Sequence, residues 1–405
     1  MLPTDEQLKI IQSGVSDIVP LKALKEKLDR QVPLRIKLGA DPTAPDLHIG
    51  HAVPLRKLRQ MQDLGHQVVL IIGDATALIG DPSGRNSTRP QLTRETIEKN
   101  AETYVQQVER ILDPAKTEIR WNSEWIYKLD LQGLLELTSN FTVARILERD
   151  DFHNRYTNQQ PISLHEFLYP TLQAYDSVAV KADVEIGGQD QLFNLLAGRE
   201  LMEKMGMEPQ VCLTLPLLEG TDGVHKMSKS YGNYIGLTDE PDDMFGKVMS
   251  IPDELMIRYY RLASTAPVSE VDELEQGLAA GTVHPNKAKR ALARNIVTAY
   301  YDEATAQSAE EAFDKVFKSH GIPDDVPEYE VEFKLNDDGL VYLPALMNEL
   351  KLAPSASEGR RLIDNGGVKI DLEPLPAKSY NLEKEKLDGV VLQVGKRKFA
   401  KLIAK

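Results

Sequence analysis

The 405-residue sequence contains a single cysteine, Cys212, so it can form neither a disulfide bond within the chain nor a cysteine-based zinc site. It also lacks long apolar segments, because a run such as residues 68–72 falls far short of the roughly 20 residues that a membrane helix needs. The beginning, MLPTDEQLKI, lacks the charged, apolar and small-residue order of a signal peptide. We therefore expect a cytoplasmic protein with no membrane partner.

Basic residues are the scarcer charge: 48 Lys and Arg stand against 62 Asp and Glu, which gives a net charge of −14. A negative total would argue against a nucleic-acid partner, because phosphates bind basic surface. The charge is unevenly distributed, however. Residues 302–338 hold 12 acidic and 3 basic residues, whereas residues 340–405 hold 8 acidic and 12 basic ones. A partner meets a local surface rather than a total, so the C-terminal segment remains a candidate for binding nucleic acid.

The length suggests two or three domains. In residues 1–235, apolar runs predict strands near 34–38, 68–72, 117–121, 183–186 and 210–217, and helical spacing covers 1–30, 55–64 and 93–112. This alternation predicts an α/β domain with a Rossmann-like, doubly wound parallel sheet. Residues 236–325 show helical spacing and predict a helical domain. After an acidic linker that contains proline, residues 340–405 predict a small α+β domain.

The segment His48-Ile49-Gly50-His51 follows an expected strand and opens an expected helix. Free N–H groups and the helix dipole at such a start attract phosphate, and Gly50 leaves room for a flat base. Two histidines beside a helix start suit a nucleoside triphosphate that is attacked at its α-phosphate. A lone pair of this kind is more often two satisfied histidines near a cap, and a zinc site lacks further ligands.

The segment Lys226-Met227-Ser228-Lys229-Ser230 lies in a glycine-rich loop after the last expected strand. Two lysines on a mobile loop can close on negative charge that grows during a reaction. A solvated basic loop is the usual alternative for two lysines. The complete pentapeptide makes a chance match rare.

In this order on an α/β domain, the two motifs resemble those of the class I aminoacyl-tRNA synthetases, which use them to bind ATP and to stabilise the transition state of amino-acid adenylation. The segments GADPTAPDLHIGH, LIGDPSGRNSTR, YPTLQAYDS and EIGGQDQLFN are similar to bacterial tyrosyl-tRNA synthetases. The resemblance implies a tyrosine–tRNA ligase that uses L-tyrosine, ATP with Mg²⁺ and tRNA(Tyr), without a tightly bound cofactor or a metal site. It also implies a homodimer whose interface is built by residues 120–165.

Tyr169, Gln173 and Asp176 are spaced i, i+4 and i+7, so they lie on one face of an expected helix. A polar stripe is usually solvated, but apolar neighbours frame this one. The resemblance implies that Tyr169 and Gln173 hold the substrate ammonium and that Asp176 accepts a hydrogen bond from the phenol hydroxyl. A buried acceptor left unpaired would penalise phenylalanine.

The resemblance assigns the remaining site residues. For catalysis it implies His48, His51, Lys226 and Lys229. For ATP binding it adds Asp41, Thr43, Gly50, Gly187, Asp190 and Met227. For tyrosine binding it adds Lys37, Gly39, Asp81 and Gln191. For pyrophosphate or the tRNA end it implies Arg85 and Arg89, although each arginine alone could be a surface charge.

Lys37 and Leu38 depart from the family pattern. Lys37 stands where many tyrosine-specific members have a tyrosine that helps to hold the substrate hydroxyl, and Leu38 stands where some have a cysteine near the ribose. These differences indicate a second bacterial subtype. Recognition of the hydroxyl would then depend more on Asp176 or on water.

The C-terminal segment resembles an S4 RNA-binding domain in its run from Ser357 to Val368 and its basic end KRKFAKLIAK. The resemblance implies tRNA contacts by Arg360, Arg361, Lys396, Arg397 and Lys398, and an anticodon-arm-binding role for residues 236–325. The alternative is a small α+β domain with a solvated basic face. The separation of basic tail from acidic body favours RNA.

Three other functions compete with this interpretation. A tryptophanyl-tRNA synthetase shares the catalytic fold but lacks an S4 tail. A small nucleotidyltransferase can carry the histidine motif but lacks the lysine motif. A non-enzymatic S4-type RNA-binding protein could retain a degenerate catalytic domain, although both motifs are intact here. ATP–pyrophosphate exchange with tyrosine, with tryptophan and without an amino acid separates all of them.

Overall fold

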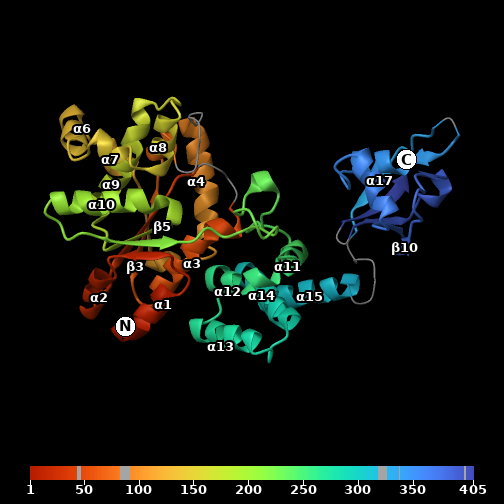
Figure 1. The fold of residues 1–405 in the computed structure, drawn as a ribbon, viewed down its shortest axis with the longest axis horizontal. Coiled ribbons are helices and arrows are strands. Elements are labelled where there is room, and N and C mark those ends of the chain that lie inside the picture. Colours follow the sequence, from red (N-terminus) through yellow and green to blue (C-terminus); the bar gives the residue numbers. More distant parts are fainter. Residues whose placement is uncertain (43–46, 83–91, 318–325, 337, 396–397) are drawn as a thin grey trace. The chain divides into compact units, whose positions relative to one another are not determined.

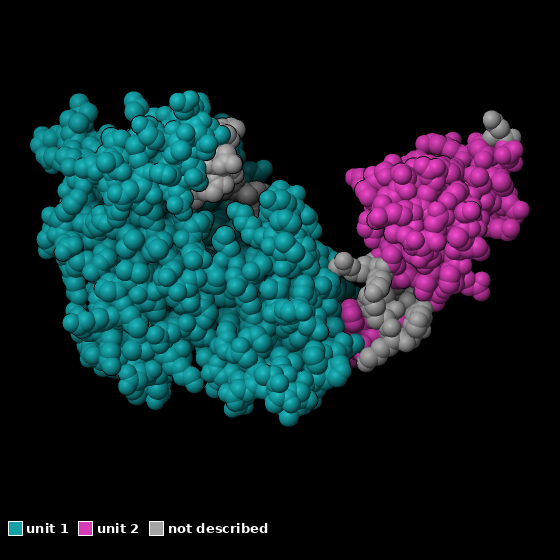
Figure 2. All heavy atoms as spheres, in the orientation of Figure 1, with its two compact units in different colours: residues 1–306 teal, residues 307–405 magenta. Residues whose placement is uncertain are grey.

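The structure is a computed structural model that describes residues 1–42, 47–82, 92–317, 326–336, 338–395 and 398–405. The chain forms two compact units, residues 1–306 (unit 1) and residues 307–405 (unit 2) (Figure 2). Within the ranges just given, no helix is long and apolar enough to span a lipid bilayer.

Unit 1 is built on a six-stranded sheet with the order β1-β6-β5-β2-β3-β4. Its strands are β1 (Asp17–Val19), β2 (Arg35–Ala40), β3 (Gln67–Ile72), β4 (Thr117–Trp121), β5 (Val184–Gly188) and β6 (Val211–Leu215). All neighbouring strands are parallel except β1, which is antiparallel to β6. The predicted α/β class and its five strands are confirmed. The sequence prediction missed β1, which interrupts a region expected to be helical.

Helices cover both faces of this sheet (Figure 1). On one face, α3 (Ile49–Asp63) packs against β2, β3 and β5. On the other, α9 (Leu168–Val180) and α10 (Leu192–Lys204) pack together and cover β2, β5 and β6. Because both faces are covered, residues 68–72 of β3 are fully buried, which explains their continuous apolar run. The remaining long helices of this part are α1 (Thr4–Gln12), α2 (Leu21–Asp29) and α4 (Arg94–Val108).

The order of the strands reverses at the boundary between β2 and β5. The chain passes from β2 to β3 and β4 on one side, and then returns to β5 and β6 on the other. In open parallel sheets, ligands bind outside the carboxyl ends of the strands at such a reversal. The topology therefore points to the loops that follow β2 and β5.

Two groups of helices complete unit 1. The first, between β4 and β5, contains α5 (Ser123–Ile126), α6 (Leu131–Thr138), α7 (Val143–Ile146), α8 (Asp150–Thr157) and the 3-10 turn η3 (Leu164–Phe167). The second contains α11 (Pro241–Met249), α12 (Met256–Ala263), α13 (Val268–Ala279) and α14 (Pro285–Tyr300). No strand lies between residues 237 and 317, all of which are described, and this agrees with the helical spacing predicted there. Residues 318–325 of that prediction lie outside the described residues. α12 packs on α3, and the Arg56 guanidinium of α3 lies 4.9 Å from the ring centroid of Tyr300.

Unit 2 is an α+β fold, as the sequence predicts. Its five-stranded sheet has the order β10-β9-β12-β13-β7, and a two-stranded sheet pairs β11 with β8. The strands are β7 (Glu328–Val331), β8 (Val341–Tyr342), β9 (Val368–Ile370), β10 (Glu373–Pro374), β11 (Asn381–Leu382), β12 (Val391–Val394) and β13 (Lys398–Ala404). α16 (Leu343–Glu349) and α17 (Ala356–Asp364) pack together, and Met347, Ile363 and Leu392 lie in a shared core. α15 (Glu303–Phe317) spans the division between the units.

Candidate active site

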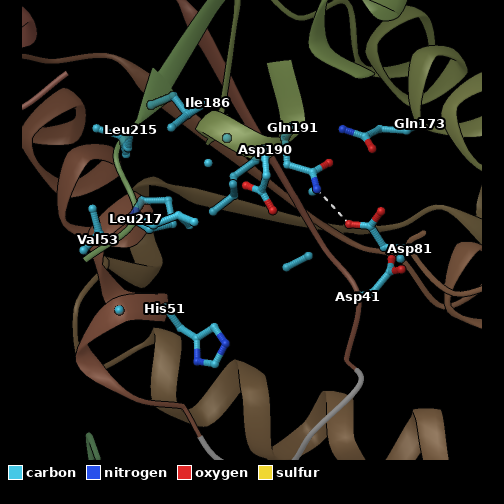
Figure 3. Close-up of a pocket in the computed structure, with 18 of the residues that line it drawn as sticks. Asp41, His51, Val53, Asp81, Gln173, Ile186, Asp190, Gln191, Leu215 and Leu217 are labelled. Carbon is cyan, nitrogen blue, oxygen red and sulfur yellow. Dashed lines mark hydrogen bonds between the residues drawn. The ribbon is translucent and has the colours of Figure 1, made fainter. Parts of the chain in front are cut away.

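A cavity of about 620 Å³ lies at the carboxyl ends of β2, β3, β5 and β6, where the strand order reverses (Figure 3). Its volume is within the usual range for small-molecule sites. The cavity brings together most of the residues predicted for catalysis, ATP binding and tyrosine binding. These are Gly39, Asp41, Gly50, His51, Asp81, Tyr169, Gln173, Asp176, Gly187, Asp190, Gln191 and Lys226.

Other predicted residues do not line this cavity. Among the described residues of unit 1 these are Lys37, His48, Met227 and Lys229. Three of these residues lie directly beside lining residues, namely His48, Met227 and Lys229. Lys37 is fully buried behind the residues that line the cavity. Thr43, Arg85, Arg89, Lys396 and Arg397 lie outside the described residues.

The start of α3 forms one wall of the cavity. The backbone N–H of His48 donates to Nδ1 of His51 at 3.3 Å, and the two rings stack with centroids 3.8 Å apart. Burial, with smaller contributions from His51 and Lys229, lowers the pKa of His48 to about 3. Although His51 is open to the cavity, desolvation between its walls and the charge of Lys229 lower its pKa to about 4. Both imidazoles are therefore neutral at pH 7, and they can offer hydrogen bonds without carrying charge.

The loop of residues 226–230 lies against this helix start. The backbone N–H of Gly50 donates to the sulfur of buried Met227 at 3.4 Å. Asn233 stabilises the loop by two hydrogen bonds. Its side chain accepts from the N–H of Ser228 at 2.8 Å and donates to the carbonyl of Lys226 at 3.2 Å. The side chains of both lysines, Lys226 and Lys229, are exposed. The loop thus presents two cations next to the helix start.

Asp41 follows β2 and is held from two sides. The Thr76 hydroxyl donates to its Oδ1 at 2.8 Å, and the Tyr169 hydroxyl donates to its Oδ2 at 3.0 Å. Burial raises the pKa of Asp41 to about 7, although these two hydrogen bonds oppose the rise. A side chain at Gly73 would place its Cβ 2.1 Å from Oδ1 of Asp41, so the position of this carboxylate requires glycine there.

Asp176 lies two turns along α9 from Tyr169 and is only 3% exposed. The indole N–H of Trp125 donates to its Oδ1 at 2.8 Å, and the amide of Asn122 donates to its Oδ2 at 3.4 Å. Burial raises the pKa of Asp176 to about 7, while the charge of Lys37 lowers it. The carboxylate keeps lone pairs for a third donor, so it can accept a hydrogen bond from a hydroxyl group inside the cavity.

A chain of amides leads from α9 to a second acid, Asp81. The Asn194 amide donates to Oε1 of Gln173 at 2.9 Å and to Oε1 of Gln191 at 2.8 Å. The Gln191 amide in turn donates to Asp81 at 2.7 Å, as the dashed line in Figure 3 shows. Asp81 also pairs with buried Arg149 at 2.9 Å. This side of the cavity is rich in acceptors.

The cavity therefore offers different chemistry along its length. Tyr169 and Asp176 are separated by roughly 10 Å along α9, given a rise of 1.5 Å per residue. The acceptors around Asp41, Asp81 and Gln173 suit an ammonium group, and Asp176 suits a hydroxyl group. The neutral histidines and the two lysines lie where phosphates would meet the start of α3.

The sequence prediction missed the residues that hold the site residues in place. Trp125 and Asn122 fix Asp176, and Asn194 joins two glutamines. Arg149 pairs with Asp81, and Thr76 holds Asp41. Only Asn194 lies within a segment noted for its resemblance, EIGGQDQLFN. The other four come from short helices and helix ends whose sequence carries no local pattern pointing to the cavity.

Nearly the whole chain is similar to known proteins. A family model described as tRNA synthetases class I (W and Y) matches residues 29–318. The chain is 52% identical over 400 residues to the tyrosine–tRNA ligase of Moorella thermoacetica, covering 98% of this chain and 95% of that one. It is 52% identical over 402 residues to the tyrosine–tRNA ligase of Geobacter sulfurreducens, covering 98% of each.

Two solved structures share the fold over about three quarters of the chain. One is a C-terminally truncated mitochondrial tyrosyl-tRNA synthetase from Aspergillus nidulans, with a TM-score of 0.63 and 21% identity over 78% of this chain and 95% of that chain. The other is a tyrosyl-tRNA synthetase complexed with L-tyrosine from Archaeoglobus fulgidus, with a TM-score of 0.63 and 22% identity over 76% of this chain and 99% of that chain.

Proposed function

The chain belongs to the class I tRNA synthetases of the tryptophan and tyrosine group, and we propose that this member acts as a tyrosine–tRNA ligase. It activates L-tyrosine with ATP and transfers the tyrosine to the 3′ end of tRNA(Tyr). The observation that carries the choice of amino acid is Asp176, a buried acceptor that the indole of Trp125 holds at the cavity wall. A hydroxyl group can donate to the remaining lone pairs of this carboxylate, whereas an apolar ring would bury them without a donor.

In the first step, a carboxylate oxygen of tyrosine attacks the α-phosphorus of ATP. A bond forms between that oxygen and phosphorus, the bond to the bridging oxygen breaks, and pyrophosphate leaves with the electron pair. Tyr169, Gln173 and Asp81 bind the ammonium group and direct the carboxylate toward the start of α3. Mg²⁺ enters with ATP as part of the substrate; the described residues include no cluster of three acidic, His or Cys side chains that could hold a metal.

The phosphates lie between the start of α3 and the loop of residues 226–230. Neutral His48 and His51 donate hydrogen bonds there, and Lys226 and Lys229 neutralise the charge that develops as pyrophosphate leaves. Gly50 and Gly187 give close approach to the nucleotide, and Asp41, Asp190 and Met227 complete its site, together with Thr43. In the second step, a terminal ribose hydroxyl of the tRNA attacks the tyrosyl carbonyl and AMP leaves.

ATP–pyrophosphate exchange tests the amino-acid specificity. We expect exchange that depends on tyrosine, and a kcat/KM for phenylalanine or tryptophan that is lower by orders of magnitude, because neither can donate to Asp176. The matched control is the same reaction without an amino acid. Exchange that depends on tryptophan, or no exchange at all, would contradict the proposed function.

We also propose that the protein is a homodimer that pairs through residues 120–165. Six large apolar side chains in this segment are exposed by at least half, namely Tyr127, Leu131, Leu135, Val143, Tyr156 and Leu164. They are carried mainly by α6, α7, α8 and η3. Figure 1 shows α6, α7 and α8 on the same side of unit 1. Such a concentration of apolar surface usually marks an interface, and the family resemblance supplies a second copy as the partner.

Leu164, which is 84% exposed, offers a direct test of this interface. We expect Leu164→Glu to weaken the dimer, because burying an unpaired carboxylate between subunits is strongly unfavourable. Sedimentation velocity measures the monomer fraction over a range of concentrations. Met205→Glu, which places the same charge at an exposed apolar site directly after α10, should leave the dimer intact. A wild-type protein that is monomeric at micromolar concentrations would overturn the proposal.

For tRNA, we propose that unit 2 contacts the phosphate backbone through α17 and that residues 236–325 bind the anticodon arm. Arg360 and Arg361 are exposed on α17. Lys398 contributes less, because its ammonium group donates to the carbonyls of Lys351 and Leu352 in the segment that follows α16. Further candidates for contacts with tRNA or pyrophosphate are Lys396, Arg397, Arg85 and Arg89.

Reversing the charge on α17 tests this surface. We expect Arg360→Glu/Arg361→Glu to lower kcat/KM for tRNA aminoacylation by about tenfold or more and to reduce its salt dependence, because each phosphate contact contributes a counterion-release term. Exchange without tRNA should be unchanged. Lys384→Glu/Lys386→Glu makes the same charge change on another turn of unit 2 and should have a smaller effect. Equal losses in the two variants would show that only net charge matters.

A further inference from the structure

Lys37 and Glu185 form an ion pair beneath the floor of the cavity. They face each other in register on the parallel strands β2 and β5. Their side chains are 0% and 1% exposed, and the Lys37 ammonium lies 2.8 Å from Oε1 of Glu185. Neither residue lines the cavity, so neither can contact a ligand there.

The ammonium group of Lys37 uses all three of its donors. Besides Glu185, it donates to the hydroxyl of Ser177 at 2.8 Å and to the backbone carbonyl of Gln173 at 3.1 Å. Gln173 and Ser177 lie on either side of Asp176 in α9. Lys37 therefore fixes the turn of α9 that carries both Gln173 and Asp176, the predicted contacts for the two ends of the substrate.

Glu185 accepts four hydrogen bonds, which fill both of its oxygens. Oε1 accepts from Lys37 and from the Gln173 amide at 3.2 Å, and Oε2 accepts from Ser177 at 3.1 Å and from Gln210. α10 packs closely over Glu185 and the groups that donate to it, because residue 198 of α10 is glycine. A Cβ at Gly198 would lie 2.8 Å from the Gln210 amide nitrogen and 3.0 Å from the Ser177 hydroxyl.

This arrangement determines which way the Gln173 amide points. An ionised carboxylate only accepts hydrogen bonds, so Gln173 must turn its NH₂ group toward Glu185. Its carbonyl oxygen then faces Asn194 and the cavity, where it accepts from the Asn194 amide at 2.9 Å. An ammonium group in the cavity needs acceptors, and this orientation supplies one. With the opposite orientation, Gln173 would present a donor to the ammonium.

Lys37 also acts on Asp176 through space. It stabilises the ionised form of that carboxylate and lowers a pKa that burial raises. The ionised form accepts a phenol hydrogen bond more strongly than the neutral acid. The same buried cation thus supports both contacts to the substrate.

We propose that Lys37 and Glu185 are positioning residues for amino-acid binding: Glu185 sets the orientation of the Gln173 amide, and Lys37 holds Glu185 and the turn of α9 that carries Asp176. This inference rests on the proposed function. The resemblance implies a direct contact between Lys37 and tyrosine. The proposal gives Lys37 an indirect role instead.

The conservative substitution Glu185→Gln tests the orientation. Glutamine keeps the shape but adds a donor, so the Gln173 amide loses its single preferred direction. We expect KM for tyrosine in ATP–pyrophosphate exchange to rise about tenfold or more, with KM for ATP within about twofold of wild type. Lys37→Met should raise KM for tyrosine by a similar factor. It should also lower the ratio of kcat/KM for tyrosine to kcat/KM for phenylalanine.

Lys27→Met is the matched control, because Lys27 is also buried and pairs with Asp183 and Glu208, yet it does not line the cavity. It should lower thermal stability without changing KM for tyrosine. A double-mutant cycle with Gln173→Ala provides a second measurement: Glu185→Gln should have little further effect once Gln173 is gone.

Three outcomes would overturn the positioning role: KM for tyrosine within twofold of wild type in folded Glu185→Gln, an equal rise in KM for ATP, or additive effects in the cycle with Gln173→Ala. The double-mutant cycle combines only Glu185→Gln and Gln173→Ala, so it can be measured even where Lys37→Met does not fold. Failure of the wild-type protein to exchange with tyrosine would instead overturn the proposed function, so the two failures are distinguishable.

Discussion

Replacing Asp176 with asparagine should lower kcat/KM for tyrosine by about 100-fold while changing that for phenylalanine far less, because a hydrogen bond to a charged acceptor contributes about 1.5–3 kcal/mol. The indole of Trp125 and the amide of Asn122 both donate to Asp176, and its carboxylate can still accept a further hydrogen bond from the substrate. In the variant, one of the two atoms becomes an NH₂ group, which faces the phenol hydroxyl with a donor instead of an acceptor.

The measurement is the ratio of kcat/KM for tyrosine and phenylalanine in ATP–pyrophosphate exchange. Tyrosyl-tRNA synthetases are themselves the reference example of this selectivity, at about 10⁵. Asp183→Asn, which neutralises an acid outside the cavity wall, is the control and should leave the ratio unchanged. An unchanged ratio in Asp176→Asn would show that another group recognises the hydroxyl.

The pH dependence of the same variant gives an independent check. Burial raises the pKa of Asp176 to about 7, so lowering the pH from 8 to 6 protonates this acceptor in the empty cavity and should raise KM for tyrosine. The pKa of Asp41 is also about 7, and its protonation weakens the attraction for the substrate ammonium in the same direction. Asp41 is present in both proteins, so the difference between the wild-type and Asp176→Asn profiles isolates Asp176.

The fold could be predicted to this extent because the strands of a covered parallel sheet are continuous apolar runs. Residues 68–72 identify β3 for that reason. β1 was missed because it has only three residues, Asp17–Val19, and pairs at the edge of the sheet, which leaves no periodicity to detect. The stripe of Tyr169, Gln173 and Asp176 was predictable because helical spacing alone places these side chains together.

The supporting residues of the site could not be predicted, because long-range packing rather than local pattern brings them there. Trp125 reaches Asp176 across 51 positions of sequence. Lys37 illustrates a different limit. It is the third residue of β2, and the cavity begins only at Leu38. Strand alternation directs its side chain toward α9, below the cavity floor, where it meets Glu185 from a strand almost 150 positions away.

Lys229→Ala should slow the formation of tyrosyl-adenylate by about 100- to 1000-fold, the usual loss when one group that stabilises transition-state charge is removed. Affinity for tyrosine should be nearly unchanged, because Lys229 does not line the cavity and lies beside the histidines instead. Both histidines are neutral at pH 7, so the cations of the loop must balance the negative charge that grows on the departing pyrophosphate.

Single-turnover measurement of adenylate formation, together with equilibrium binding of tyrosine, separates the two effects of Lys229→Ala. Lys22→Ala, an exposed lysine on α2, should alter neither quantity. An unchanged rate would remove Lys229 from the catalytic group. An equal loss of tyrosine affinity would mean that the loop shapes the empty pocket. A group accelerates the chemical step only if it interacts with the transition state more strongly than with the ground state. If Lys229 is such a group, Lys229→Ala must form the adenylate more slowly while its affinity for tyrosine stays unchanged.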